Sequence, residues 1–92
     1  MIIRSQDMKE IHNLDRVSNI AVLPCFGNEN VFLIEVNRQH TIGTYSTEEK
    51  AIKVLDMICE EYKKPDMWAE YSCNEMVIHN KTIFQMPQDS EV

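Results

Sequence analysis

The first half of the chain carries apolar residues in short runs that predict β-strands. Ile2-Ile3-Arg4 begins a strand, and residues 10–14 (Glu-Ile-His-Asn-Leu) are placed to pair back against it as a first hairpin. Residues 17–23 alternate in part between apolar and polar, and they end at Pro24, which cannot donate to a strand ladder. These three segments predict three short strands before residue 24.

The next segment contains the most apolar run of the chain. Residues 27–30 (Gly-Asn-Glu-Asn) predict a turn, because Gly and Asn tolerate positive φ and both flanks are rich in β-forming residues. Residues 31–36 (Val-Phe-Leu-Ile-Glu-Val) are nearly continuous in apolar side chains, which predicts the central, most buried strand. After a turn at 37–40, residues 41–45 predict a further strand, so the first half reads as a meander of four or five strands.

An amphipathic helix is predicted at about residues 47–64. Ser46 can cap its N-terminus with Glu49 completing a capping box, and Thr47 is the alternative cap. Apolar residues recur at spacings of three and four and form one stripe that needs a sheet to bury it. The stripe consists of Ala51, Val54, Leu55, Ile58, Cys59 and Tyr62. Pro65 ends the helix, since it cannot continue a helical ladder.

The segment after the helix has a weaker pattern. Residues 66–73 fit a short helix, a turn or a covering loop, and the sequence does not choose among them. Residues 76–78 and 82–86 flank His79-Asn80-Lys81, which predicts a second hairpin that returns to the sheet. Polar residues 88–92 after Pro87 predict a frayed tail.

These elements predict an α+β fold in a single small domain at residues 1–87. We expect an antiparallel sheet of about five strands with the 47–64 helix packed across one face. The chain has 92 residues, which supplies buried surface for one hydrophobic core and no more.

The charge and hydropathy of the chain argue against two classes of function, nucleic-acid binding and membrane spanning. The formal net charge is −6, and such a chain repels the phosphate backbone, so we expect no direct binding of nucleic acid. No run approaches the roughly 20 apolar residues that a membrane span needs. The start of the chain lacks the basic and apolar regions of a secretory signal, which predicts a cytoplasmic protein that does not bind membranes.

The sequence contains no pattern that specifies catalysis, a metal or a cofactor. Cys25, Cys59 and Cys73 are widely spaced and fit neither a disulfide framework nor a zinc module, so we interpret them as packing residues, with Cys59 in the core. The three histidines form no ligand pair in the sequence. With two isolated glycines, the chain also has no phosphate-binding loop. We therefore predict no catalytic residue, no metal site and no cofactor.

Large apolar and acidic side chains concentrate around and after the end of the helix, and they are the candidates for binding a partner. Trp, Tyr and Met are favoured in contact patches between proteins. The candidate partner-binding residues are Trp68, Tyr71, Met67, Glu60, Glu61 and Glu70. The alternative is that the apolar members close an open end of the small core, and the sequence leaves both interpretations open.

Four segments of the chain resemble a known group of sequences. They are residues 1–7 (MIIRSQD), 13–17 (NLDRV), 42–51 (IGTYSTEEKA) and Met86-Pro87. Together they look like segments of short uncharacterised proteins encoded by phages and mobile elements of Gram-positive bacteria. The resemblance implies a small acidic protein that binds a host or phage protein, including inhibition of a host nuclease or defence protein.

The function predicted from these observations is a non-catalytic protein-interaction module, with a homo-oligomer as a further expectation because small sheets leave edges that pairing covers. The alternative is a protein that binds a small, nucleotide-like ligand as an oligomer. Its pocket would lie between helix and sheet or between subunits, and would use Arg38, Tyr45, Trp68 or Tyr71.

Overall fold

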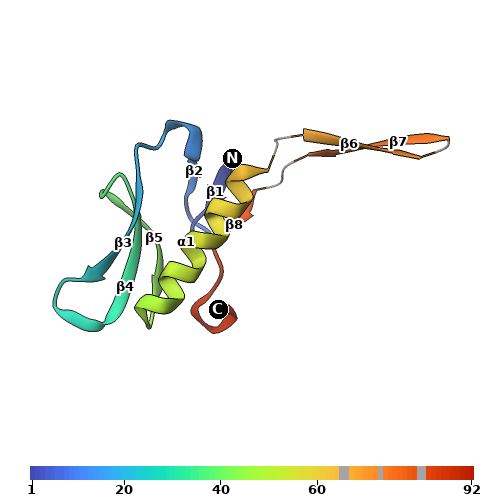
Figure 1. Cartoon of the computed structure of the whole chain (residues 1–92). Coiled ribbons are helices and arrows are strands. Elements are labelled where there is room, and N and C mark those ends of the chain that lie inside the picture. Colours follow the sequence, from blue (N-terminus) through green and yellow to red (C-terminus); the bar gives the residue numbers. More distant parts are fainter. Residues whose placement is uncertain (65–66, 73, 81–82) are drawn as a thin grey trace.

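The longest strands form an antiparallel sheet in the order β3-β4-β5 (Figure 1). The computed structural model describes residues 1–64, 67–72, 74–80 and 83–92, with the backbone alone for 67–72 and 77–80. The strands of this sheet are β3 (Ile20–Cys25), β4 (Asn28–Val36) and β5 (His40–Tyr45). The prediction that residues 31–36 form the central strand is confirmed, since β4 pairs with a neighbour on each side.

A second sheet of three strands forms around the start of the chain. Strand β1 (Ile2–Arg4) pairs antiparallel with β2 (Ile11–Asn13) and parallel with β8 (Phe84–Gln85). The structure therefore has two three-stranded sheets in place of the single sheet of about five strands that the sequence predicted. The sheets stay separate because β1 is already paired on both edges. Gln6, which follows β1, links them through a backbone hydrogen bond from its N–H to the Ile42 carbonyl of β5 at 2.8 Å.

The remaining two strands form a hairpin that extends away from the rest of the chain in Figure 1. Strand β6 (Met67–Ser72) pairs antiparallel with β7 (Glu75–Asn80). For residues 66–73 the sequence analysis left a helix, a turn or a loop open, and the structure has a strand at 67–72. The predicted hairpin of residues 76–78 with 82–86 is wrong. Residues 84–85 instead join β1, because Phe84 opposite Ile3 packs against the hydrophobic core.

Helix α1 (Glu48–Lys63) lies against β3, β4 and β5, as the sequence predicted for this amphipathic segment. Its N-cap is Thr47, whose hydroxyl accepts a hydrogen bond from the Lys50 N–H at 3.1 Å. The first-choice cap of the sequence analysis, Ser46, is wrong, because its backbone N–H and hydroxyl both donate to Asp89. At the other end Lys64 adopts an extended conformation, as expected for a residue before proline.

The hydrophobic core lies between α1 and the two sheets. The helix contributes Ala51, Val54 and Ile58, which are 3% exposed or less. The second sheet contributes Ile3 at 0%. The other buried apolar residues are Met1, Leu14, Ile34, Val36, Ile42, Tyr45 and Met86. Residues from both ends of the chain therefore share one core with the helix.

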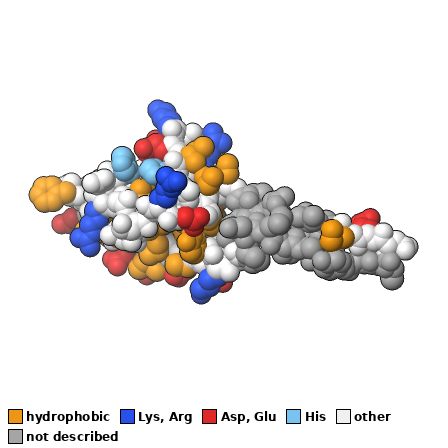
Figure 2. Space-filling model, turned by 90° about the horizontal axis from the view of Figure 1, so that it is seen from above, with side chains coloured by type: hydrophobic (Ala, Val, Ile, Leu, Met, Phe, Trp, Pro, Cys, Tyr) orange, Lys and Arg blue, Asp and Glu red, His pale blue; other side chains and the backbone are white. Residues whose placement is uncertain are grey.

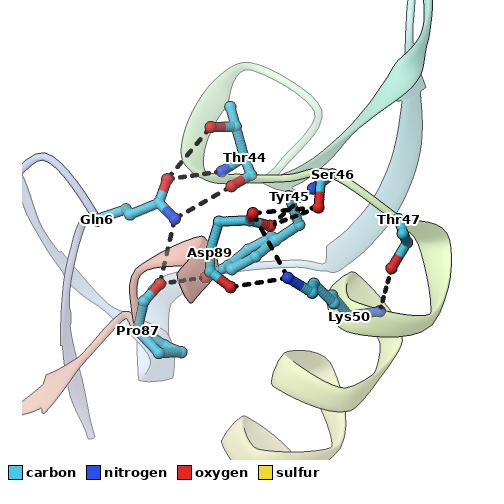
Figure 3. Close-up of polar contacts among 8 residues, drawn as sticks. All are labelled: Gln6, Thr44, Tyr45, Ser46, Thr47, Lys50, Pro87 and Asp89. Atoms are coloured by element: carbon cyan, nitrogen blue, oxygen red, sulfur yellow. Dashed lines mark hydrogen bonds and ion pairs between the residues drawn. The ribbon is translucent and has the colours of Figure 1, made fainter. Parts of the chain in front are cut away.

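The last residues of the chain make specific contacts with the beginning of α1 (Figure 3). The Tyr45 hydroxyl donates to the Pro87 carbonyl at 2.8 Å, and the Gln6 amide donates to the same carbonyl at 3.1 Å. Asp89 accepts hydrogen bonds from the Ser46 N–H at 2.8 Å and from the Ser46 hydroxyl at 3.1 Å, and it forms an ion pair with Lys50 at 3.5 Å. These bonds tie the C-terminal segment to β5 and α1.

The structure differs here from the frayed tail that the sequence predicted for residues 88–92. Residues Asp89–Glu91 form the short 3-10 helix η2, and Val92 packs against the core. The bonds from Ser46, with the Lys50 charge, hold the pKa of Asp89 below its ordinary value. The difference arises because the partners of Asp89 lie some forty positions earlier in the sequence, where no local pattern reveals them.

Tyr45 gives the protein an expected loss of stability at alkaline pH. Burial of the ring, together with the charges of Asp89 and Glu91, raises the pKa of Tyr45 to about 12 from 10.0. The unfolded chain loses this proton at lower pH than the folded one, so stability is full below pH 10 and falls between pH 10 and 12. By about pH 11 the expected loss is about 1.4 kcal/mol.

This expectation is checked by urea unfolding of wild type and Tyr45→Phe at pH 9 to about pH 11. The difference between the two proteins isolates Tyr45 from the other groups that titrate in this range. A loss of stability that is equal in the two proteins would contradict the assignment to Tyr45.

Candidate functional site

Strand β3 has an outer edge that is not paired with any of the residues that the structure describes. The Asn37 N–H donates to the Asn19 carbonyl at 2.9 Å, so the residue before β3 is bonded toward β4. Because this direction alternates along an antiparallel strand, the backbone groups of Ile20 and Val22 point to the outer edge. Pro24 belongs to the same outward set, which is the position where a strand tolerates the missing N–H.

A second apolar stripe lies on the side of α1 that faces β3. It consists of Ile52, Leu55, Cys59 and Tyr62, which are spaced by three, four and three residues and therefore share one helix face. The stripe is only partly covered, since Ile52 is 42% exposed and Tyr62 is 48% exposed. We name these four residues the outer stripe of α1.

Two hollows lie between the outer stripe and β3. The larger has a volume of about 510 Å³ and lies at the C-terminal end of the helix. Its lining is mostly apolar and comprises Leu14, Val17, Asn19, Ile20, Leu55, Ile58, Cys59, Tyr62 and Lys63. The smaller, of about 190 Å³, lies at the N-terminal end and is lined by Val22, Pro24, Phe32, Glu48 and Ile52. An apolar seam thus accompanies the open edge of β3.

The two ends of this seam carry opposite charge. Glu48 lies beside the smaller hollow in the first turn of α1, and Lys63 lies beside the larger hollow in its last turn. Lys63 is 73% exposed and contacts Glu60 at 3.4 Å, an exposed pair of the kind that contributes little to stability. The middle of the seam has no charged lining residue among those described.

The structure does not bring all of the predicted partner-binding residues into this seam. Glu60 and Glu61 line a different hollow of about 330 Å³, with Lys53, Asp56, Met57 and Phe84. They pair with Lys63 and Lys64 at 3.4 and 2.8 Å. Met67, Trp68, Glu70 and Tyr71 belong to β6, and their side chains lie outside the described part of the structure. The prediction for these four side chains stays untested.

The sequence analysis misplaced Cys59 and Tyr62. It put both on one buried stripe, but Cys59 and Tyr62 are exposed and only Ala51, Val54 and Ile58 are fully buried. The spacing of the six residues is ordinary for a helix face that packs on a sheet, so the sequence carried no signal that one side of the stripe stays uncovered. The Tyr62 hydroxyl donates to Asp15 at 3.0 Å, which holds the end of the stripe next to the 3-10 helix η1 (Leu14–Arg16).

The two histidines whose side chains the structure describes form a separate cluster. His12 and His40 have ring centroids 5.6 Å apart and form a pale blue pair in Figure 2. Glu10 Oε1 lies 3.9 Å from His12 Nε2 and 3.8 Å from His40 Nδ1, and the buried His12 Nε2 has no hydrogen-bond partner. Within the described residues, no group of three or more His, Cys, Asp or Glu side chains could hold a metal ion.

Two residues that the sequence analysis gave to a ligand pocket do not line the seam. Tyr45 is 2% exposed and its hydroxyl is bonded to Pro87. Arg38 lies in the turn between β4 and β5, with a positive φ of 56°. No helix in the described part of the chain has the length and apolar character required to cross a membrane.

Comparisons of the chain with protein-family models, with curated proteins and with solved structures gave no match. The geometry of the β3 edge and of the outer stripe is therefore the main basis for inferring a function.

Proposed function

We propose that this chain is a non-catalytic protein-interaction module that binds an extended segment of another polypeptide along the outer edge of β3. The added strand forms backbone hydrogen bonds with Ile20 and Val22. Its alternate side chains enter the two hollows between β3 and α1. Backbone bonds supply affinity in this mode of binding, and the hollows supply specificity.

The observation that carries this proposal is the open β3 edge. Natural proteins protect such an edge with charged residues, proline or a bulge. Pro24 and the register shift at Pro24/Cys25 protect the C-terminal end of β3, but Ile20-Ala21-Val22-Leu23 carries no charged residue. All four residues are only partly buried. Pairing with a further strand removes this apolar surface from water and satisfies the outward backbone groups.

The resemblance to phage and mobile-element proteins gives this proposal a biological context. It implies that the partner is a host or phage protein, for which we propose a host nuclease or defence protein that the chain inhibits. The surface of this chain is acidic overall, with a net charge of −6, and is suited to a basic partner. The partner itself is expected to present an apolar segment that β3 can pair with.

The volume of the larger hollow favours a second candidate function. At about 510 Å³ it falls within the range of roughly 300–1,000 Å³ for small-molecule pockets, and Lys63 and Asn19 offer polar groups at its wall. The ligand would be a small molecule with an apolar body and an anionic group. Native mass spectrometry of gently purified protein tests this alternative, since a retained ligand adds its mass to that of the chain.

Photo-crosslinking from the outer stripe tests the interaction module. A benzophenone attached to Cys59, in a protein whose Cys25 and Cys73 are replaced by Ser, is expected to form protein crosslinks in host or infected-cell lysate. The matched control attaches the same group at position 57 in Met57→Cys, Cys59→Ser, because Met57 is 40% exposed and lines the hollow that contains Phe84. Equal crosslinking from both positions contradicts binding at the seam.

A backbone variant makes this experiment specific for strand pairing. Val22→Pro removes an outward N–H and leaves the ladder to β4 intact, as Pro24 already does two residues later. We expect the crosslinks from position 59 to fall at least about tenfold, which corresponds to about 1.4 kcal/mol of binding free energy. Crosslinks that persist at full strength in a folded Val22→Pro protein would show that the β3 edge is not used.

A further inference from the structure

We infer that the segment of the partner that pairs with β3 runs antiparallel to it and has a defined order of side chains. From its N-terminus it carries a basic residue, a small apolar residue and a large apolar residue at alternate positions. This inference rests on the proposed function, because it describes the occupant of the same surface. It follows from the outward residues of β3, the unequal volumes of the two hollows and the charge beside the smaller one.

The register of β3 determines which residues of an added strand face α1. Ile20, Val22 and Pro24 have outward backbone groups, and the same three residues line the hollows under the helix. Residues directly opposite each other in an antiparallel pair have their side chains on the same face of the sheet. The residues opposite Ile20, Val22 and Pro24 therefore face α1, and the residues between them face away from it. Contact with the helix depends on every second residue of the segment.

The two hollows differ in size along this row. The smaller, of about 190 Å³, lies beside Val22 and Ile52, and it has room for a short branched side chain such as that of valine. The larger, of about 510 Å³, lies beside Ile20 and extends to Tyr62, and it has room for an aromatic ring. In an antiparallel pair the residue opposite Val22 comes two positions before the residue opposite Ile20. The small apolar residue therefore precedes the large one.

The smaller hollow has a negative charge at the end where α1 begins. Glu48 is exposed and forms no ion pair with the other residues that the structure describes. Because β3 and α1 run in opposite directions in Figure 1, the start of the helix lies toward Pro24. A Lys or Arg opposite Pro24 is thus placed beside Glu48, whose full charge exceeds the roughly half unit of positive charge at a helix N-terminus.

The other end of the seam carries no comparable preference for charge. Lys63 lines the larger hollow but already contacts Glu60 at 3.4 Å. The charge selection therefore lies at the basic position alone, in agreement with the net charge of −6 on this chain.

The backbone of β3 favours the antiparallel direction. Ile20 and Val22 can each exchange both of their hydrogen bonds with the residue opposite, and the Pro24 carbonyl can accept one more from the basic residue. A parallel strand forms slanted bonds and is slightly less stable per residue.

Binding of three synthetic peptides of the same composition tests the inference. The first, Ser-Arg-Thr-Val-Thr-Phe-Thr-Ser, has the inferred order, the second exchanges its Val and Phe, and the third is the first written backwards. A parallel strand would place the third peptide in the same hollows. In fluorescence anisotropy titrations we expect the first to bind most tightly, with a Kd at least about fivefold below that of the second. Val22→Pro is expected to remove this binding, and circular dichroism verifies that the variant is folded.

A charge exchange tests the basic position. Glu48→Lys is expected to weaken binding of the first peptide at least about twofold, and to strengthen by a similar factor a fourth peptide in which Glu replaces Arg. Glu49→Lys is the matched control, because it changes the net charge equally from the next position of the helix, and Glu49 does not line the hollow. Equal effects of the two variants would show that the peptides respond to net charge and would overturn the basic position opposite Pro24.

The remaining outcomes separate this inference from the proposed function. The inference is overturned if no peptide binds, if the first two bind equally, or if Val22→Pro leaves binding unchanged. Tighter binding of the third peptide overturns the antiparallel direction. In each case the interaction module survives if lysate crosslinks from position 59 appear and fall in Val22→Pro. Loss of both peptide binding and these crosslinks removes the inference and the proposed function together.

Discussion

Ile3→Ala is expected to lower the free energy of unfolding by about 3 kcal/mol, within the range measured for removing a buried isoleucine. The Ile3 side chain is 0% exposed and belongs to the core that α1 shares with both sheets. Strand β1 is three residues long, and Ile3 is the one of the three that is buried, so it supplies the strand's contact with the core. Urea or thermal unfolding followed by circular dichroism measures the loss.

The adjacent residue provides the control. Ile2 has the same side chain and lies on the same strand, but it points to the opposite face and is 39% exposed. Ile2→Ala is therefore expected to cost about 1 kcal/mol or less. Similar losses for the two variants would mean that β1 does not insert Ile3 into the core.

Gly43→Ala is expected to lower the free energy of unfolding by about 2 kcal/mol, because the buried side chains of Tyr45 and Met86 must shift by a few tenths of an ångström to admit a Cβ. A Cβ at this position would lie 3.0 Å from Met86 Cε and from Tyr45 Cε2. Gly43 therefore lets the Tyr45 ring and the Met86 side chain pack directly on β5. The loss is measured by chemical unfolding of Gly43→Ala and wild type.

A double-mutant cycle checks that this contact causes the loss. In a Met86→Val background the competing methyl group is gone, so Gly43→Ala is expected to cost at least about 0.5 kcal/mol less than in wild type. Gly27→Ala serves as a comparison without a steric contact. Nothing lies within 4 Å of a Cβ at Gly27, so any loss of stability there comes from its φ of 85°. Additive losses for Gly43 and Met86 would contradict a shared contact.

Local patterns in the sequence predicted the elements whose causes are local. The helix at 48–63 has its cap, its apolar spacing and its proline stop within twenty residues, and its predicted bounds differ from the observed ones by one residue. The meander of β3, β4 and β5 was also predicted, because two short turns connect strands that are neighbours in sequence. The choice of Thr47 over Ser46 as cap depended on Asp89, which is distant in sequence.

Strand partners that are far apart in sequence were not predicted. Residues 84–85 pair with β1 across eighty positions, and the hairpin of β6 and β7 replaces the pairing expected for the last third of the chain. Short apolar segments satisfy their backbone groups equally well with several partners. Core packing decides among these partners, and the sequence pattern does not record it.

The candidate site shows the same division between sequence and structure. The sequence alone determined the apolar composition of β3, the proline at its end and the spacing of Ile52, Leu55, Cys59 and Tyr62, because these are properties of single elements. Only the tertiary structure decided that β3 has an open edge, that this side of α1 lies beside it, and that Glu48 and Lys63 mark opposite ends of the seam. The reason is physical: periodicity fixes which face of an element is apolar, whereas the packing of all elements together fixes which apolar surface stays uncovered.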